Sequence, residues 1–360
     1  MTTRGDVRVG LIGSGFARRV QLPAIAWVPG AKPIAIASGH RANAESVARE
    51  FGVPRVFTEG TDLATSPDVD LVIVSSTPDS HARYAIAALE AGKHVLCEKP
   101  MALDAFEASQ MVTASQQHPD RLAWIDHELR YEPNRRRARE LIRSDAIGEL
   151  RHIELSLKPY LRGDGRPQAF DAPWNWWFDA SRGGGILGAV GSHLIDLCRF
   201  WAGSEITYVG GLVETFVKER KDETGAMHPV TADDFASCVL RTGSGVAATI
   251  TLSTVAHHGS GHHGQVTGSD GTLVLSGETK LELGKPGGPL EDISAPDDLT
   301  DKMKPNNMWA RSFVRLLREM VHLIGEGGGT PQGEPATFRD GWQVQRVLDA
   351  VRGGRGVQLD

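Results

Sequence analysis

The chain has 360 residues, of which 40% are hydrophobic and 23% are charged, a balance typical of a globular protein large enough for two domains. Its formal net charge of -6 argues against a nucleic-acid partner, and its three cysteines are too widely spaced for a disulfide framework or a zinc site. The first residues lack the plan of a secretory signal, and no stretch approaches the roughly 20 apolar residues of a membrane span. We therefore expect a cytoplasmic protein with no membrane partner.

Residues 7–126 repeat one pattern, in which a short apolar run is followed by a turn and then by a helical stretch. Alternation at this spacing predicts a parallel sheet with crossover helices, that is, a Rossmann domain over residues 1–126. The run Leu71–Ser75 is rich in β-branched residues, as expected of a strand buried on both faces. The expected strands are Val7–Ile12, Pro33–Ser38, Leu71–Ser75, His94–Cys97 and Leu122–Asp126, and the expected helices run towards Trp27 and over Ala42–Phe51, His81–Ala91 and Leu103–Gln117.

The pattern changes after residue 126, where long segments alternate apolar and polar residues and are joined by Gly-rich connections. This predicts an α+β domain over residues 127–360 with an open, mostly antiparallel sheet and a closing helix near residues 338–352. A basic run at residues 135–139 is interpreted as a solvated helix face, and Gly284–Pro305 as a surface excursion. The expected strands are Leu150–Lys158, Ile206–Val217, Phe235–Arg241 and Val246–Ser253, and the expected helices are Pro133–Ser144, His193–Trp201 and Trp309–Ile324.

A Gly-rich turn follows the first expected strand. In a Rossmann turn the first glycine allows a tight bend and the second lets the backbone approach a pyrophosphate, while the next helix offers free N–H groups. Gly13 and Gly15 occupy these positions, but Arg18 stands where a third glycine or alanine is usual, so the helix must pack on the strand differently. The candidate cofactor-binding residues of this turn are Gly13, Gly15, Phe16 and Ala17.

The end of the second strand bears on the choice between NAD and NADP. An acidic residue about 20 positions after the glycines normally holds the ribose 2′-hydroxyl of NAD. Between Gly13 and Glu45 the chain has none, and it offers Ser38, His40 and Arg41 instead. A hydroxyl, an imidazole and a guanidinium suit a 2′-phosphate better than a diol, so NADP is the preferred cofactor and NAD the alternative. Arg41 could also simply begin a solvated helix.

The stretch Asp70–Leu103 contains two further motifs, a TP-x-x-H turn at Thr77–His81 and an E-K-P block at Glu98–Pro100. With the Gly-rich turn and the GGGxL…GxHxxD stretch at Gly183–Asp196, these motifs resemble the Gfo/Idh/MocA oxidoreductase family, named for glucose–fructose oxidoreductase and inositol dehydrogenase. The resemblance covers almost the whole chain, and the E-K-P block is its most specific part.

Several expectations come from this resemblance. It implies that Lys99 is catalytic, binding the substrate oxygen at a strand end while hydride leaves the adjacent carbon, and that the Lys99–Pro100 peptide is cis. It also implies a homodimer or homotetramer formed through the C-terminal sheet. The further cofactor-binding candidates that it supplies are Ser75, Thr77, Pro78, His81, Glu98 and Lys99.

The GGGxL…GxHxxD stretch departs from the family at one position. Members that resemble inositol dehydrogenase carry an Asp and a His four residues apart, which share one helix face. Here the His is retained as His193, but the Asp position holds Ala189. We expect His193 to be the second catalytic residue, moving the proton, and also to contact substrate. A packed core histidine is the competing interpretation.

The remaining substrate-binding candidates are less specific. His127 and Arg130 follow the last Rossmann strand, where the family places residues that face substrate, and Tyr160 and Trp176 come from an aromatic stretch suited to sugar rings. Core or interface packing explains the aromatic stretch equally well. The His-rich tract at residues 257–263 is expected in a hairpin-like connection between strands and has no carboxylate or Cys nearby, so no metal site is expected.

Together these features predict an enzyme, an NAD(P)-dependent oxidoreductase acting on a CH–OH group of a sugar, polyol or related carbohydrate-like ring compound. Two alternatives remain at this point. One is a family member that uses its nicotinamide only transiently to permit sugar elimination or hydrolysis. The other is a non-catalytic dinucleotide-binding sensor, which the loss of the Asp at position 189 keeps open and the retention of Lys99 and His193 opposes.

Overall fold

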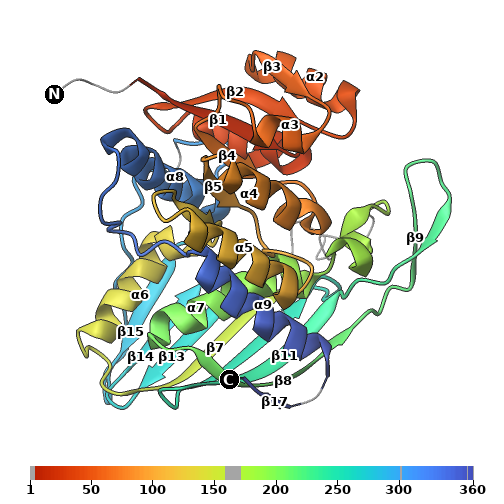
Figure 1. The fold of residues 1–360 in the computed structure, drawn as a ribbon. Helices are drawn as coiled ribbons and strands as arrows, with labels where there is room; N and C mark the ends of the chain where they lie inside the picture. Colours follow the sequence, from red (N-terminus) through yellow and green to blue (C-terminus); the bar gives the residue numbers. More distant parts are fainter. Residues whose placement is uncertain (1–4, 159–171, 301, 355, 360) are drawn as a thin grey trace. The chain divides into compact units, whose positions relative to one another are not determined.

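The structure is a computed structural model that describes residues 5–158, 172–300, 302–354 and 356–359 (Figure 1). The chain forms two compact units. The first comprises Met1–Glu132 and Asp298–Trp342, and the second comprises Pro133–Asp297 and Gln343–Asp360. Among the described residues no helix combines the length and the apolar character needed to cross a bilayer.

The first unit is built on a six-stranded sheet in the order β3-β2-β1-β4-β5-β6, with every pair parallel. This is the doubly wound order of a dinucleotide-binding fold, so the Rossmann prediction is confirmed. The strands are β1 (Val7–Ile12), β2 (Ala31–Ala37), β3 (Arg55–Phe57), β4 (Leu71–Val74), β5 (His94–Cys97) and β6 (Ala123–Ile125). The helices between them are η1 (Ala17–Gln21), α1 (Leu22–Ile25), α2 (Arg41–Phe51), α3 (Gly60–Ala64), η2 (Pro78–Ser80), α4 (His81–Glu90), α5 (Ala105–Gln117) and η3 (Glu128–Tyr131).

Both faces of this sheet are buried. Along β4, Leu71 and Ile73 belong to one apolar cluster and Val72 and Val74 to the other, and all four are 0% exposed. The helix α8 (Met308–Glu326) contributes Phe313 and other apolar residues to the first of these clusters. This packing explains why residues 298–342 join the first unit, whereas the sequence suggested a single boundary at residue 126.

The second unit is built on a nine-stranded sheet in the order β16-β15-β14-β13-β7-β12-β11-β8-β17. Among the described residues of this sheet only β7 and β12 pair in parallel, so the prediction of an open, mostly antiparallel sheet is confirmed. The strands are β7 (Leu150–Lys158), β8 (Ile206–Glu214), β11 (Phe235–Thr242), β12 (Ala247–Ser253), β13 (Gly261–Gly268), β14 (Thr272–Ser276), β15 (Lys280–Gly284), β16 (Leu290–Asp292) and β17 (Val357–Gln358).

Helices and a hairpin complete the second unit. In Figure 1 α7 lies across the nine-stranded sheet, and the hairpin β9–β10 extends away from it. The closing helix α9 begins and ends at the expected residues, and its last ten residues belong to this unit. These elements are α6 (Pro133–Arg143), η4 (Trp176–Phe178), η5 (Ala180–Arg182), η6 (Leu187–Gly191), α7 (Ser192–Ala202), β9 (Glu219–Lys221), β10 (Met227–Pro229) and α9 (Phe338–Arg352).

Two interpretations of basic or His-rich segments need correction. Arg135 is 1% exposed, and its Nη2 lies 2.8 Å from Nδ1 of His262, so the basic run is not a wholly solvated face. Burial lowers the pKa of His262 well below its usual range, so this ring is neutral and accepts the hydrogen bond from the guanidinium. His262 itself lies inside β13 rather than in a connection between strands.

Candidate active site

The Gly-rich turn brings the end of β1 against the end of β4. Gly13 has φ +109°, and a Cβ built there would lie 2.3 Å from the carbonyl oxygen of Ser75, so only glycine fits. A Cβ at Gly15 would meet nothing within 4 Å, and this residue is exposed. The first glycine is therefore required by the fold, whereas the second leaves open space at the surface of the turn, as approach of a dinucleotide phosphate requires.

The helical stretch after the turn begins with a π-helical segment, Ala17–Gln21, before α1. Ala17 and Gln21 are 0% exposed, so these two residues face the sheet. Arg18 points outward and pairs with Glu50 of α2 at 2.7 Å. The π-helical register thus explains how the chain does without a third glycine or alanine at position 18. The small residue that is buried against the sheet is Ala17, and Arg18 remains at the surface. Segments of π-helix are frequent at functional sites.

The end of β2 lies beside the Gly-rich turn. Ser38 Oγ is 3.2 Å from Ser14 Oγ, which joins the two segments that would hold a ribose. His40 precedes α2 and its backbone N–H donates to Ser38 Oγ at 3.4 Å. Arg41 is the first residue of α2, its side chain is 74% exposed, and its Nε donates to Glu45 at 2.7 Å. Ser38 therefore lies against the Gly-rich turn, while Arg41 is engaged in a surface ion pair.

The two family motifs of the first unit meet through His81. This ring is fully buried, with Nδ1 3.0 Å from the carbonyl oxygen of Pro100 and Nε2 3.1 Å from that of Ser76. Burial lowers the pKa of His81, so the ring is neutral and donates through whichever nitrogen carries the proton. Because a neutral ring has one N–H, His81 donates to only one of these carbonyl oxygens and packs against the other, which keeps the turn after β4 beside the cis Lys99–Pro100 peptide that the resemblance implied. Both ring nitrogens of His81 face backbone carbonyl oxygens, so the role of this residue is structural.

Lys99 is held at the carboxyl end of β5. Its Nζ lies 3.4 Å from Oε2 of Glu98 and 5.5 Å from the centroid of the Phe16 ring, and its side chain is 14% exposed. Gln21 Nε2 donates to the other carboxylate oxygen of Glu98 at 3.0 Å. Burial is the largest single effect and opposes the charged form of Lys99, but the carboxyl groups of Glu98, Glu128 and Asp126 together outweigh it, so the pKa of Lys99 is raised. Lys99 is therefore an ammonium fixed near the Gly-rich turn.

Two further acids, which the sequence analysis did not select, lie close to this ion pair. The strands β5 and β6 pair in parallel with Cys97 opposite Ile125, so Glu98 and Asp126 emerge side by side. Burial, followed by the neighbouring carboxyl groups of Glu128 and Glu98, raises the pKa of Asp126 well above its usual range. Burial also raises the pKa of Glu128 to about 8. The usual position of ligands outside the carboxyl ends of parallel strands could have indicated Asp126.

The two substrate candidates that follow β6 have different surroundings. Arg130 donates to the carbonyl oxygen of Glu334 at 3.1 Å and to Oδ1 of Asp340 at 3.0 Å, and its side chain is 7% exposed. These contacts anchor η3 to the start of α9 within the first unit and give Arg130 a structural role. His127 is 2% exposed.

In the second unit Trp176 and Trp177 pack against the glycines before η6. A Cβ at Gly184 would lie 2.3 Å from the carbonyl oxygen of Trp177 and 2.8 Å from that of Trp176. The Gly185 backbone N–H donates to the Trp177 carbonyl at 3.0 Å. Trp176 is half-buried and contacts Trp177 edge to face, with ring centroids 6.1 Å apart. The glycines therefore bring Trp176 close to the start of the helix that carries His193.

His193 lies in the first turn of α7, directly after the π-helical segment η6, and is 1% exposed. Ala189 lies within η6 and is half-buried. Asp233 accepts a hydrogen bond from the backbone N–H of Leu187 at 2.7 Å, and burial raises the pKa of Asp233. The Asp233 carboxyl group therefore lies at the N-terminal end of η6, whereas position 189 within η6 holds an alanine.

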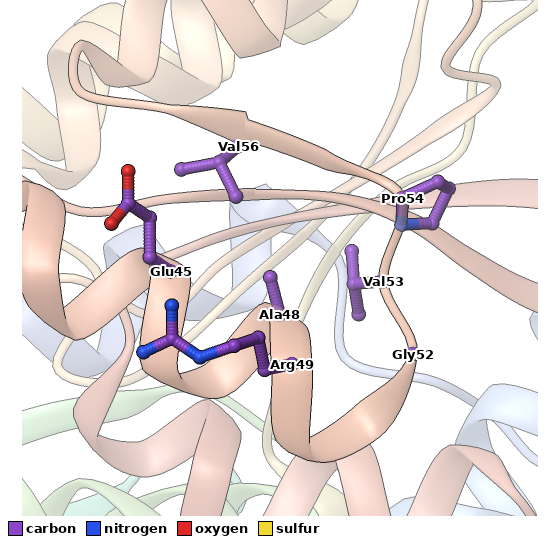
Figure 2. Close-up of a pocket in the computed structure, with 7 residues that line it drawn as sticks. All are labelled: Glu45, Ala48, Arg49, Gly52, Val53, Pro54 and Val56. Carbon is purple, nitrogen blue, oxygen red and sulfur yellow. The ribbon is translucent and has the colours of Figure 1, made fainter.

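The other candidates can be placed briefly. Tyr160 lies outside the described residues. Ser75 is buried, with its Oγ 3.3 Å from the Ile12 carbonyl oxygen, and Thr77 and Pro78 begin the turn η2. Within the described part of the chain no three His, Cys, Asp or Glu side chains gather as a metal site. Figure 2 shows a shallow hollow between α2 and β3, lined by Glu45, Ala48, Arg49, Gly52, Val53, Pro54 and Val56. None of these residues belongs to the group formed by Lys99, Glu98 and Gln21.

Comparison with known proteins gives matches in both units. A family model described as an oxidoreductase family with an NAD-binding Rossmann fold matches residues 7–127, and the GFO/IDH/MocA C-terminal domain matches residues 135–274. An uncharacterized oxidoreductase of Synechocystis is 29% identical over 98% of this chain and 95% of its own. Levoglucosan dehydrogenase of Pseudarthrobacter phenanthrenivorans is 28% identical over 96% of this chain and 95% of its own.

Solved structures show the same fold. A levoglucosan dehydrogenase in complex with NADH and levoglucosan superposes with a TM-score of 0.84 at 24% identity, covering 98% of this chain and 99% of that chain. An oxidoreductase domain protein from Kribbella flavida gives a TM-score of 0.84 at 27% identity, covering 99% of this chain and all of the other.

Proposed function

Because the chain belongs to the Gfo/Idh/MocA family of oxidoreductases with an NAD-binding Rossmann fold, we propose that it transfers a hydride between a nicotinamide and a carbinol carbon of a sugar, polyol or related ring compound. The observation that carries this proposal is the Lys99 ammonium, fixed 3.4 Å from Glu98 and 5.5 Å from the Phe16 ring of the Gly-rich turn. A surface dinucleotide site alone does not require a fixed ammonium beside it.

The proposed chemistry assigns one step to each catalytic residue. A bound nicotinamide takes up or supplies the hydride. Lys99 binds the substrate oxygen and stabilises the negative charge that develops there, a role worth several kcal/mol in a water-poor site. His193 moves the hydroxyl proton, as a histidine does near neutral pH. Trp176, close to the helix of His193, offers an apolar face for a sugar ring.

We favour NADP over NAD as the cofactor. No acidic side chain follows β2, and the Ser38 hydroxyl is placed beside the Gly-rich turn. An Arg41 guanidinium that is 74% exposed can turn from Glu45 to a 2′-phosphate. Dissociation constants for NADH and NADPH decide this point, and equal or tighter binding of NADH contradicts it. Arg41→Ala is expected to weaken NADPH binding while leaving NADH binding unchanged.

A carbohydrate substrate is supported by the relatives. Levoglucosan dehydrogenase, which matches this chain over 96% of its length, acts on an anhydrosugar according to its name. The substrate class proposed here is therefore a polyhydroxylated ring. The departure at Ala189 points to a substrate different from that of the inositol dehydrogenases, because the carboxylate that would bind one of the hydroxyl groups is missing.

The decisive experiment is a screen of sugars, polyols and keto-sugars for a change in nicotinamide absorbance with both cofactors. With the best substrate, Lys99→Ala should reduce turnover about 100-fold or more while cofactor still binds, and Lys32→Ala on the exposed part of β2 serves as the matched control. Tight cofactor binding without turnover on any compound would overturn the proposal in favour of a sensor. Elimination without net change of the nicotinamide would favour the transient use of the cofactor.

We also propose that the outer face of the nine-stranded sheet joins copies of this chain. Tyr208, Leu212 and Val239 are 39%, 49% and 52% exposed, and the pairing of Val239 with Gly210 places all three on the same face. Light scattering of the wild type and of Val239→Glu tests this assignment. An oligomer that dissociates in the variant supports it, and a monomeric wild type contradicts it.

A further inference from the structure

Gln21 is a buried polar residue among apolar neighbours. It lies in η1 and is 0% exposed, and the nearby residues Ala17, Leu22 and Ile25 belong to the apolar cluster on one face of the six-stranded sheet. Its Oε1 has no hydrogen-bond partner among the described residues. Burying an amide whose oxygen is unpaired is costly, so packing alone would favour an apolar side chain at this position. The presence of Gln21 is therefore explained by the group to which its Nε2 donates.

That group is the carboxylate of Glu98. Nε2 of Gln21 donates to Oε1 of Glu98 at 3.0 Å, and Glu98 is 6% exposed. The other oxygen, Oε2, faces Lys99 twice, because the Lys99 backbone N–H donates to it at 3.3 Å and Nζ lies 3.4 Å away. The last torsion of a glutamate side chain is only loosely defined by itself. A carboxylate that is held at Oε1 keeps Oε2 directed at the ammonium.

We propose that Gln21 is a positioning residue for the reaction, which fixes the Glu98 carboxylate and, through it, the Lys99 ammonium at the end of β5. This inference rests on the proposed function, in which Lys99 stabilises the negative charge that develops on the substrate oxygen. Such stabilisation is strongest when the charge is already in place before the reaction, and a lysine that samples several rotamers loses part of it. Removal of the Gln21 donor should therefore lower kcat more than it changes KM.

The first test removes the donor and keeps an unbranched side chain of similar length. Gln21→Met does this, and Gln116→Met makes the same change at an exposed position of α5. We expect Gln21→Met to lower kcat about tenfold, with KM and the cofactor dissociation constant changed less than about threefold, and Gln116→Met to change none of them. A folded Gln21→Met protein with the kcat of the wild type would overturn the inference. So would weaker cofactor binding at unchanged kcat, because Gln21 would then hold Glu98 for the cofactor.

The second test makes the donor depend on pH. In Gln21→Glu the new carboxyl group donates to Glu98 only while it carries a proton, and it repels Glu98 once ionised. Burial beside another carboxylate favours the neutral form, so this variant should lose its donor within the range of the assay. The wild type has the same other carboxyl groups near Lys99, those of Glu98, Asp126 and Glu128, and is therefore the baseline.

We expect the ratio of kcat in Gln21→Glu to kcat in the wild type to fall about tenfold between about pH 6 and 9, towards the value of Gln21→Met. A residue that only fills space or satisfies a buried group would not add such a step to the pH profile. A ratio that does not depend on pH in a folded Gln21→Glu protein would overturn the inference.

A third measurement needs no turnover. In protein labelled with ¹⁵N at the lysine side chains, the ammonium NMR signal that is lost in Lys99→Ala belongs to Lys99. We expect this signal to shift or broaden in Gln21→Met and to stay unchanged in Gln116→Met. An unchanged Lys99 signal in Gln21→Met would overturn the inference alone. A wild type without turnover on any tested compound would overturn the proposed function instead.

Discussion

The two glycines of the nucleotide turn should respond very differently to the same substitution. Gly13→Ala forces a β-carbon into φ +109° and to within 2.3 Å of the Ser75 carbonyl oxygen, where an ordinary contact begins near 3.4 Å. The close atoms are backbone, so β1 and the end of β4 must separate by about 1 Å. Strain of about 1–3 kcal/mol and overpacking of about 1–3 kcal/mol together predict a loss of roughly 2–6 kcal/mol.

Gly15→Ala is the matched control, because a Cβ at Gly15 meets nothing within 4 Å and its φ lies outside the left-handed region. We expect Gly15→Ala to keep the melting temperature of the cofactor-free protein and to weaken dinucleotide binding, since a methyl group would occupy the surface that a phosphate approaches. Gly13→Ala should lower the melting temperature by roughly 5–20 °C even without cofactor, for a unit of this size.

Thermal melts with and without cofactor, together with titrations of NADH and NADPH fluorescence, separate the two effects. A cofactor-free Gly13→Ala protein that melts within about a degree of the wild type would refute the argument from close approach. So would a Gly15→Ala protein that melts as early as Gly13→Ala. If Gly15→Ala bound both dinucleotides as well as the wild type, the assignment of this turn to the phosphates would be wrong.

Three other predictions concern stability. The pKa of Glu128 is raised to about 8 in the fold, above its ordinary 4.5, so between these pH values the native state keeps a proton that the unfolded chain loses. The free energy of unfolding should therefore fall as the pH rises from about 4.5 to 8. If urea titrations of Glu128→Gln gave the same dependence of this free energy on pH as the wild type, the prediction would be contradicted. His81→Ala should cost about 2–5 kcal/mol by removing a buried ring and its hydrogen bond to a backbone carbonyl, checked by the urea midpoint against the exposed His322→Ala. Asp233→Ala, which leaves the Leu187 N–H without its acceptor, should cost about 1 kcal/mol in the same assay, and an unchanged midpoint would refute that contribution.

The strands of the first unit could be predicted because both faces of the sheet are covered. β1 and β5 have the predicted bounds, and the apolar runs Val9–Ile12 and Val95–Cys97 within them reflect burial on both sides. The edge strand β3 was missed, since its three residues are only half-buried and give no periodic signal. β13 was also missed as a strand, because its glycines and histidines have little β-propensity and it is held by pairing with β7 and β14.

Long-range packing explains the other differences. No local pattern shows that α8 returns to the first unit, because its apolar face looks the same whichever sheet it covers. Arg135 was interpreted as solvated on composition alone, and only the fold reveals its buried partner His262. At the site, Lys99 could be selected from its motif. Gln21 could not, because its contact with Glu98 depends on the π-helical register of Ala17–Gln21. Asp126 could have been indicated by its place just after β6 at the carboxyl edge of the sheet.

The motifs of the first unit form one support for Lys99. The Glu98 backbone N–H donates to the Val74 carbonyl oxygen at 2.8 Å, which fixes the chain just before Lys99, and His81 holds the Pro100 carbonyl just after it. Gln21 directs the Glu98 carboxylate from the opposite side. A side chain that must act within a few tenths of an ångström needs such second contacts, because an unsupported lysine samples many rotamers. The His of the TP-x-x-H turn therefore supports Lys99 indirectly, by packing against the backbone of the E-K-P block.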